Sequence, residues 1–376
     1  AMTAPTCPRP EYPRPGLVRP DWLCLNGAWD FAIDAGDSGW ERGQLKGPFD
    51  QTITVPFCPE SALSGIGITD HLGCVWYRRE ITVPKDWAGK RTILHFQAVD
   101  HDATVWVNGV EVARHRGGWA PFSADITAQA PSGATATVVV RARDDHRLVK
   151  PMGKQSSQVQ NSGCHYTRTT GIWQTVWLEP VPEAHLLRPR ITPDVAGRRL
   201  RIEAPVAKGR PGQTVRVVVR SAGREVASDE RRLGFDGCAQ VDAVIAEADV
   251  RLWCPDDPFL YDVELSLLAS DGTIIDRVQS YAGLRGVAID GQKVLINGKP
   301  VFQRLVLDQG YYADGILTAP SEEALVRDIE LSLSVGFNGA RLHQKVFEER
   351  FLYHCDRLGY LVWGEFGDWG GNGAMH

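Results

Sequence analysis

The sequence predicts a multidomain protein in which two β-sandwiches precede the start of an α/β barrel. The chain has 376 residues, which exceeds the roughly 100–200 residues of one ordinary domain. Short β-branched runs separated by Gly and Pro occupy most of the chain, as they do in sandwich domains. After residue 284 the pattern changes to strands that alternate with helices, which is typical of parallel βαβ units.

The first predicted domain, residues 1–182, shows strands and turns but no helical periodicity. Two β-branched runs, 104–107 and 110–112, flank the dipeptide Asn108-Gly109. Asn and Gly accept the positive φ angles of a two-residue hairpin turn. We therefore expect a β-sandwich of the jelly-roll kind.

The second predicted domain, residues 183–283, follows a proline-containing linker at 180–182. Roughly one hundred residues with short strands fit an immunoglobulin-like sandwich. The Cys…Trp…Cys signature of true immunoglobulin domains is absent, so the prediction depends on strand number and spacing. The clearest predicted strands are 200–203, 215–219 and 261–267.

The third predicted domain, residues 284–376, begins a TIM (β/α) barrel of about three strands. A complete barrel needs eight strands and about 250 residues, whereas 376 − 284 + 1 = 93 residues are present. Three parallel strands leave apolar faces and edges open, so we expect this segment to pack on the second sandwich or on another polypeptide. The predicted elements are a strand at 300–307, a helix with N-cap Ser321 that ends before Gly336, a strand at 337–343, a helix that Gly359 stops, and a strand at 360–364.

Composition excludes several function classes. With 41 basic and 46 acidic residues, the net charge is −5, and the absence of a basic tract argues against nucleic acid as a partner. No run approaches about 18 apolar residues, so no membrane span is expected. The N-terminus lacks a signal-peptide pattern, which favours a cytoplasmic location; Ala1 before Met2 resembles an expression scar, so a removed leader stays an alternative.

The eight cysteines are scattered, without a Cys-x-x-Cys pair or a Cys/His cluster at zinc-site spacing. We therefore expect free thiols, no metal and no cofactor.

Several strings, in this order along the chain, resemble glycoside hydrolase family 2. Each string alone is weak evidence, but together they cover nearly the whole sequence. The resemblance implies a jelly-roll sugar-binding domain, an immunoglobulin-like domain and a TIM-barrel catalytic domain, with retaining hydrolysis of β-glycosides as the activity. The strings are VPFCPES at 55–61, WYRR at 76–79, GGWAPF at 117–122, TTGIWQTVWL at 169–178, LWCPDDPFLY at 252–261 and LINGKPV at 295–301.

Retaining glycosidases use two carboxyl groups about 5–5.5 Å apart, one as acid and base and the other as nucleophile. The resemblance places these glutamates on barrel strands four and seven, the former within an Asn-Glu pair. This chain stops after the third predicted strand and contains no Asn-Glu dipeptide. We therefore expect an N-terminal portion of the enzyme that is inactive as given, because both catalytic glutamates lie beyond its C-terminus.

Residues at the carboxyl ends of barrel strands face the substrate site. By resemblance, Arg341 matches an arginine that supports the nucleophile, while His165 aligns with an aspartate that reaches the sugar in better-known members; the identity of the sugar therefore stays open. Ordinary alternatives are a simple ion pair for Arg341 and a core position for His343. The expected substrate-site residues are Asp308, Gln309, Arg341, His343, Trp363, Glu365 and Trp369, with His165 contributed by the first domain.

The tryptophans allow two interpretations, as sugar-binding residues or as packing residues. Trp363 and Trp369 could stack on a sugar ring or pack at the barrel mouth. Trp40, Trp87 and Trp119 are expected to be exposed, as packing residues or ligand platforms.

The expected partners are a β-glycoside or oligosaccharide and the missing barrel or another polypeptide. A paired-carboxylate role for Asp308 and Glu365 is the least favoured reading of the site. The alternative function is that of a non-catalytic carbohydrate-binding or scaffold protein with a vestigial barrel tail. The gene sequence downstream of residue 376 separates the two.

Overall fold

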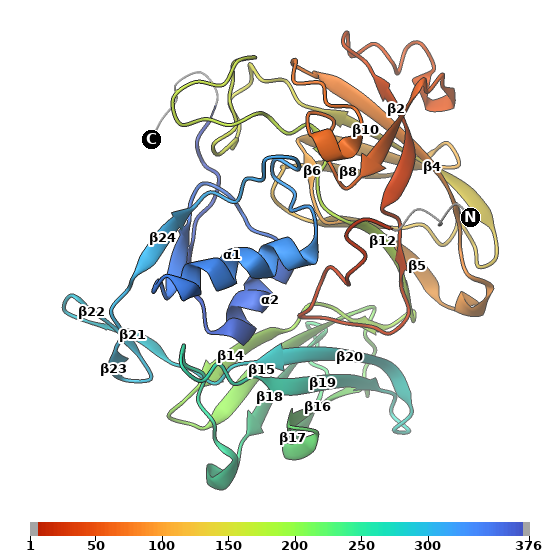
Figure 1. Ribbon diagram of the computed structural model, residues 1–376. Helices are drawn as coiled ribbons and strands as arrows, with labels where there is room; N and C mark the ends of the chain where they lie inside the picture. The colour runs from red at the N-terminus through yellow and green to blue at the C-terminus, as the bar shows by residue number, and fades with distance from the viewer. Residues whose placement is uncertain (1–6, 371–376) are drawn as a thin grey trace, which may run out of the picture.

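The computed structural model describes residues 7–370, and most of the chain forms β-sheets (Figure 1). Two sandwiches lie at opposite ends of the molecule, and a small α/β unit near the C-terminus lies beside both. None of the described helices has the length and apolar character needed to cross a bilayer.

The first sandwich packs a six-stranded antiparallel sheet against a four-stranded one. Alternate side chains of both sheets point inward and build a core that includes Trp29, Phe31, Tyr77 and Phe96. The larger sheet has the order β3 (Gln51–Val55), β2 (Gly27–Ile33), β4 (Cys74–Thr82), β10 (Thr135–Arg143), β7 (Asp102–Val107), β8 (Val110–Arg116). The smaller sheet is β1 (Leu23–Cys24), β12 (Val176–Val181), β5 (Arg91–Phe96), β9 (Phe122–Asp125), and β6 (Val99–Asp100) pairs separately with β11 (Gly171–Ile172).

The hairpin predicted at Asn108-Gly109 is confirmed. Both residues have positive φ, 50° and 79°, between β7 and β8. This conformation suits the twist of the two strands.

The second sandwich is immunoglobulin-like and places two four-stranded antiparallel sheets around a core rich in valine and leucine. One sheet contains β13 (His185–Leu186), β15 (Arg199–Ala207), β14 (Arg190–Asp194) and β18 (Cys238–Val244). The other has the order β17 (Arg224–Arg232), β16 (Thr214–Ser221), β19 (Tyr261–Leu268), β20 (Ile274–Ala282).

The α/β unit contains a parallel three-stranded sheet, β24 (Leu305–Asp308), β25 (Gly339–Leu342) and β26 (Leu361–Gly364). Helices α1 (Glu322–Ser334) and α2 (Glu349–Leu358) cover one face of it. The caps follow the prediction: Ser321 Oγ accepts a hydrogen bond from Ala324 N, and Gly359 ends α2 with a φ of 76°.

The single strand predicted at 300–307 is wrong. A short hairpin, β21 (Val287–Asp290), β22 (Lys293–Ile296) and β23 (Lys299–Pro300), precedes the parallel sheet, and only residue 305 begins β24. Residues 301–304 lie outside both strands because they carry the chain from β23 of the hairpin to β24 of the parallel sheet. The Asn338 side chain supplies hydrogen bonds to the backbone of this connecting segment, since it accepts from Arg304 N and donates to the Phe302 carbonyl.

The face of the parallel sheet opposite the helices is open. Leu307, Arg341 and Trp363 are register partners, so their side chains form one row across this face. Their exposed fractions are 51% for Leu307, 53% for the Arg341 side chain and 53% for Trp363.

The α/β unit packs on both sandwiches, which confirms the expectation that it would pack on the second. Trp253 and Tyr281 of the second sandwich donate hydrogen bonds to Asp356 of α2, at 2.6 and 2.9 Å. On the other side, Met152 N of the first sandwich donates to the Trp369 carbonyl at 2.7 Å.

An extended N-terminal strap, residues 7–19, runs among all three units (red in Figure 1). Arg9 is buried and donates to the Ala319 carbonyl and the Glu348 carboxylate of the α/β unit. Arg19 is also buried and bonds Glu179 of the first sandwich and Asp276 of the second.

Candidate functional site

The carboxyl ends of β25 and β26 meet at the Glu365 carboxylate. Arg341 Nε donates to Oε1, His343 Nδ1 lies 2.8 Å from Oε2, and Gln344 N donates to Oε2 at 3.2 Å. Burial opposes the charge of Glu365, but these hydrogen bonds and the Arg341 charge outweigh it and lower its pKa. Glu365 is therefore an ionised anchor for Arg341 and His343.

The other predicted residues on the parallel sheet form contacts of their own, apart from the Glu365 carboxylate. The Asp308 carboxylate turns back to accept Gly310 N at 2.8 Å, and its carbonyl accepts His343 N at 2.8 Å. Gln309 follows it at the same strand end. Trp363 lies on the open face and donates to Gln303 Oε1 at 3.3 Å.

A loop of the first sandwich, residues 144–168, reaches this strand end. The Trp369 ring lies near two histidines, with its centroid 5.7 Å from that of His343 and 6.0 Å from that of His165. Lys154 Nζ lies 3.8 Å from the centre of the same ring. The predicted residues His165, His343 and Trp369 are thus brought together. Asp308 meets His343 only through its backbone carbonyl, and Trp363 lies apart on the open face.

Lys154 is a buried cation with few partners. Its exposed fraction is 4%, and its ammonium donates to Cys164 Sγ at 3.2 Å. Among residues 7–370 it forms no ion pair. An ammonium group carries three donors, so this site can accept an oxygen-rich or anionic group.

Gln344 joins the loop to the strand end. It has a positive φ of 54°, donates to Asp368 Oδ1 at 2.6 Å and accepts Trp369 N at 3.0 Å. Gly153 lies against its backbone carbonyl, where any Cβ would overlap with the oxygen. The close approach of the two segments therefore requires glycine at 153.

Sequence reasoning missed Gln344, Lys345 and Lys154. The two former residues directly follow His343, so their position at a strand end was a usable signal. Lys345 is buried and donates to the carbonyls of Gly310 and Leu317, and burial lowers its pKa to about 8. No sequence pattern near Lys154 indicated that this residue would lie at the site.

The expected exposure of Trp87 and Trp119 is wrong. Their exposed fractions are 4% and 6%, because Trp87 joins the first core and Trp119 packs edge-on against Trp173. Trp40 is exposed as expected and stacks on Trp106.

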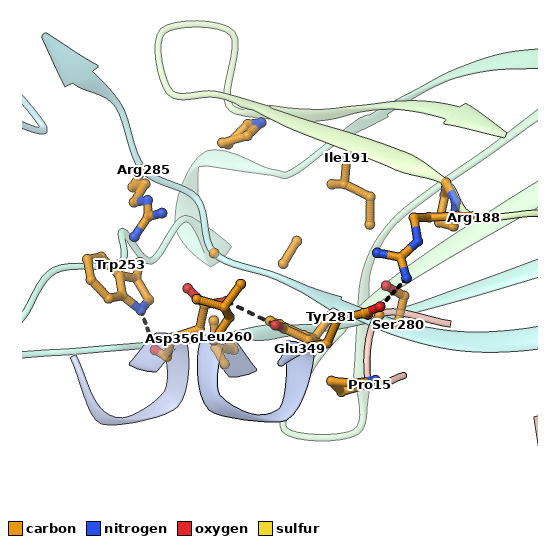
Figure 2. Close-up of a pocket in the computed structure, with 16 residues that line it drawn as sticks. Pro15, Arg188, Ile191, Trp253, Leu260, Ser280, Tyr281, Arg285, Glu349 and Asp356 are labelled. Carbon is orange, nitrogen blue, oxygen red and sulfur yellow. Dashed lines mark hydrogen bonds and ion pairs between the residues drawn. The ribbon is translucent and has the colours of Figure 1, made fainter. Parts of the chain in front are cut away.

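A cavity of about 380 Å³ lies between the second sandwich and α2, and Figure 2 shows its lining. Its polar groups already contact one another: Arg188 pairs with Glu349, Tyr281 donates to Asp356, and Arg285 lies over the Trp253 ring. None of the predicted site residues lines it. It is a crevice between two packed units rather than part of the strand-end site.

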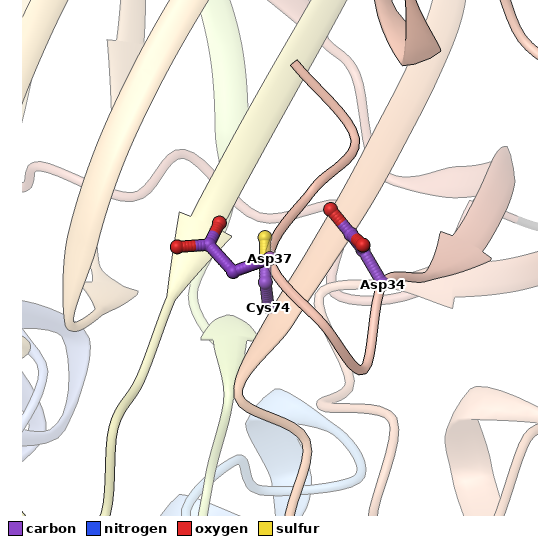
Figure 3. A group of neighbouring side chains, drawn as sticks. All are labelled: Asp34, Asp37 and Cys74. Atoms are coloured by element: carbon purple, nitrogen blue, oxygen red, sulfur yellow. The ribbon is translucent and has the colours of Figure 1, made fainter. Parts of the chain in front are cut away.

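Asp34, Asp37 and Cys74 lie close enough to share a metal ion (Figure 3). The Asp34 carboxylate is nevertheless saturated by protein donors, namely Ser38 N, Gly39 N, Trp76 Nε1 and Arg42. Burial raises the pKa of the Cys74 thiol well above its usual value, which disfavours the thiolate that a metal needs. The arrangement fits a loop anchor better than a metal centre.

Comparison with known proteins identifies the two sandwiches. The family model described as "Glycosyl hydrolases family 2, sugar binding domain" matches residues 38–182, and the one described as "Glycosyl hydrolases family 2" matches residues 184–285. A solved structure, b-glucuronidase from Ruminococcus gnavus in complex with D-glucuronic acid, has a similar fold, with a TM-score of 0.77 at 24% identity; the match covers 96% of this chain and 62% of that one.

Curated proteins with similar sequences support the same identification. A "Beta-glucuronidase" of Paenibacillus borealis is 30% identical over 370 residues, which are 94% of this chain and 60% of the relative. A "Beta-galactosidase" of Thermoanaerobacter pseudethanolicus is 27% identical, over 78% of this chain and 39% of the relative. The chain thus spans about three fifths or less of these relatives. With both sandwich models matched in the order that the sequence predicts, the chain belongs to glycoside hydrolase family 2.

Proposed function

We propose that this chain is the N-terminal portion of a retaining β-glycoside hydrolase. In this proposal, residues 1–182 are the sugar-binding-like domain, 183–283 the immunoglobulin-like domain and 284–376 the first three strands of a TIM barrel. One observation carries the proposal: an arginine, a histidine and a carboxylate are joined at the carboxyl end of a parallel sheet, where barrel enzymes place their sites.

The open face of the sheet supports the barrel assignment. The row of Leu307, Arg341 and Trp363 would point into the interior of a closed barrel, which side chains normally fill. Helices already cover the other face, as in the outer ring of a barrel. Completion by further strands would bury the row.

The local chemistry assigns supporting roles to the residues present. A glycosidase acid needs a raised pKa to hold its proton near neutral pH, whereas the pKa of Glu365 is lowered and its oxygens are occupied. Glu365 would therefore fix the guanidinium of Arg341, which would in turn hold the nucleophilic carboxylate. The two working glutamates would come from strands outside this chain.

We propose a glucuronide or another anionic β-glycoside as the substrate. Several of the relatives are named beta-glucuronidases. Within the described residues, the Lys154 ammonium donates one hydrogen bond, to Cys164, and it lies at Trp369 beside the strand end; the His165 ring lies 6.0 Å from the same indole. The Lys154 ammonium suits a sugar carboxylate, and the indole suits the sugar face.

The test is a panel of nitrophenyl β-glycosides assayed with this chain and with the longer gene product. This chain should give no turnover, and the longer product should hydrolyse the glucuronide best. Hydrolysis by this chain that Glu365→Gln abolishes would overturn the proposal. A natural stop codon after residue 376, with glycan binding retained, would favour the binding or scaffold protein instead.

A further inference from the structure

Two cysteine thiols meet where the N-terminal strap passes the first strand. Cys7 Sγ and Cys24 Sγ lie 3.4 Å apart, and both residues are half-buried. Cys7 lies at the start of the described strap, and Cys24 ends β1. Among the described residues, no other two cysteine sulfurs are in contact. A small movement would bring this pair to bonding distance.

The surroundings favour a thiolate at Cys7. Its hydrogen bond with Cys24 and, against the opposing effect of burial, the charge of Arg79 lower the pKa of the Cys7 thiol. The Arg79 guanidinium is held in place because it donates to the carbonyls of Leu25 and Asn26 at 2.6 and 2.9 Å. A thiol with a lowered pKa next to a positive charge and a second thiol has the features of a reactive cysteine.

The strap gives this contact structural importance. Asn26 Nδ2 donates to the carbonyls of Pro8 and Arg9, so the strap is already held to the segment after β1. Downstream, Arg9 and Arg19 tie it to the other two units. A covalent bond at Cys7 would fix the end of a segment that contacts every unit of the molecule.

We propose that Cys7 and Cys24 form a redox modification site, at which a small disulfide such as oxidised glutathione converts the two thiols into a disulfide that staples the strap to β1. The Cys7 thiolate attacks one sulfur of glutathione disulfide and releases one glutathione thiolate. The Cys24 thiol then gives its proton to the released glutathione thiolate and attacks the Cys7 sulfur, which releases the second glutathione as a thiolate that takes a proton from water. Two protein thiols are oxidised, and one glutathione disulfide is reduced to two glutathiones.

The sequence allows a direct test by peptide mapping of the full chain after equilibration with oxidised glutathione and alkylation. Digestion with an endoproteinase that cleaves before aspartate cuts at Asp21 and separates the two cysteines, so a link joins two peptides. Trypsin does not separate them, because proline follows each basic residue between them. These residues are Arg9, Arg14 and Arg19.

We expect a linked peptide pair with two thiols fewer available for alkylation, and no link in Cys24→Ser. In that variant Cys7 should instead carry one glutathione. Cys164 is exposed and has no second thiol beside it, so it serves as the internal reference for a stable mixed disulfide. Glutathione on both Cys7 and Cys24 without a link, or no reaction at Cys7 under conditions that modify Cys164, would overturn the proposal.

A second measurement tests the staple itself. Closure of the loop from 7 to 24 restricts the unfolded chain, so the oxidised protein should unfold at a temperature at least a few degrees higher than oxidised Cys24→Ser. The matched control is Cys254→Ser, another half-buried thiol, which should keep the full oxidative shift. A link that forms without any shift would contradict the stapling role.

Discussion

Two glycines in the loop 144–168 show how a single position can hold two units together. Gly153 and Gly163 have almost the same positive φ, 62° and 60°, so alanine is strained equally at both. Only at Gly153 would the new Cβ overlap with the Gln344 carbonyl, whereas space is open at Gly163. The difference between the two variants therefore isolates the contact between the loop and the strand end.

We expect Gly163→Ala to lower the free energy of unfolding by about 1 kcal/mol, and Gly153→Ala by about 2 kcal/mol more. Denaturant unfolding monitored by fluorescence measures both. Hydrogen exchange should also show faster exchange at the Met152 and Gly153 amides in the Gly153 variant. Equal losses of stability in the two variants would show that the contact is unimportant.

Glu60 gives a prediction about pH. It is buried in the first sandwich, Oε2 accepts Thr170 N at 3.1 Å, and Oε1 has no hydrogen-bond partner among the described residues. Burial raises the pKa of Glu60 to about 8. Between its unfolded pKa of about 4.3 and this value, the folded state retains a proton that the unfolded chain releases. Stability therefore falls as pH rises through this window.

Glu60→Gln should remove that slope and raise the free energy of unfolding at pH 7 by about 2–3 kcal/mol. Urea titrations at pH 5, 6, 7 and 8 measure the effect. The exposed Glu41→Gln variant is the control and should follow the wild-type curve. An unchanged slope in the Glu60 variant would mean that the carboxyl is ionised and solvated in the folded state.

At the scale of elements, Glu365 joins the segment after β26 to β25 through Arg341 and His343. Glu365→Gln should lower the free energy of unfolding by about 1–2 kcal/mol at pH 7. Because the folded pKa of Glu365 is lowered, its stabilising effect is present above the unfolded pKa and is lost as pH falls through the folded value. The difference from wild type should therefore shrink below about pH 4, with the exposed Glu330→Gln on α1 as the neutral control.

The elements were predictable where local chemistry decides. The hairpin turn at Asn108 and the helix ends at Ser321 and Gly359 follow from φ preferences and capping, which act within a few residues. The strand predicted across residue 302 does not form, although the sequence there is β-like, because the chain has to pass from one sheet to another at this point. The Asn338 side chain bonds the backbone of this connecting segment.

The candidate site was predictable only in part, for the same reason. Arg341, His343 and Glu365 were indicated by their positions at strand ends, and the contacts among them follow from parallel pairing of β25 and β26. Lys154 comes from a loop of another unit, and no periodicity near it indicates that it approaches Trp369. Such contacts between distant segments depend on how whole units pack.

At the scale of the whole molecule, Arg19 links the two sandwiches. Its guanidinium pairs with Glu179 and Asp276, and all three groups are buried. Arg19→Ala leaves two buried carboxylates without this partner, which typically costs about 3–5 kcal/mol. We expect calorimetry to show a lower and broader transition, with the two sandwiches unfolding at separate temperatures.

The control for this variant is Arg188→Ala, which removes an exposed ion pair with Glu349 at another contact between units. Exposed pairs contribute at most about 1 kcal/mol, so the unfolding curve should hardly change. A single sharp transition in the Arg19 variant would show that the strap does not couple the sandwiches.

The strap also has a consequence for the order of folding during synthesis. Arg9 and its partner Glu348 are 339 residues apart in the sequence. At about 5–20 residues per second, a ribosome needs roughly 20–70 s to deliver the partner after the arginine. Over that interval both sandwiches can fold while Arg9 lacks its partner. Arg9, which emerges early, is thus among the last residues to reach its final partner, and its pairing with Glu348 requires the α/β unit to be in place.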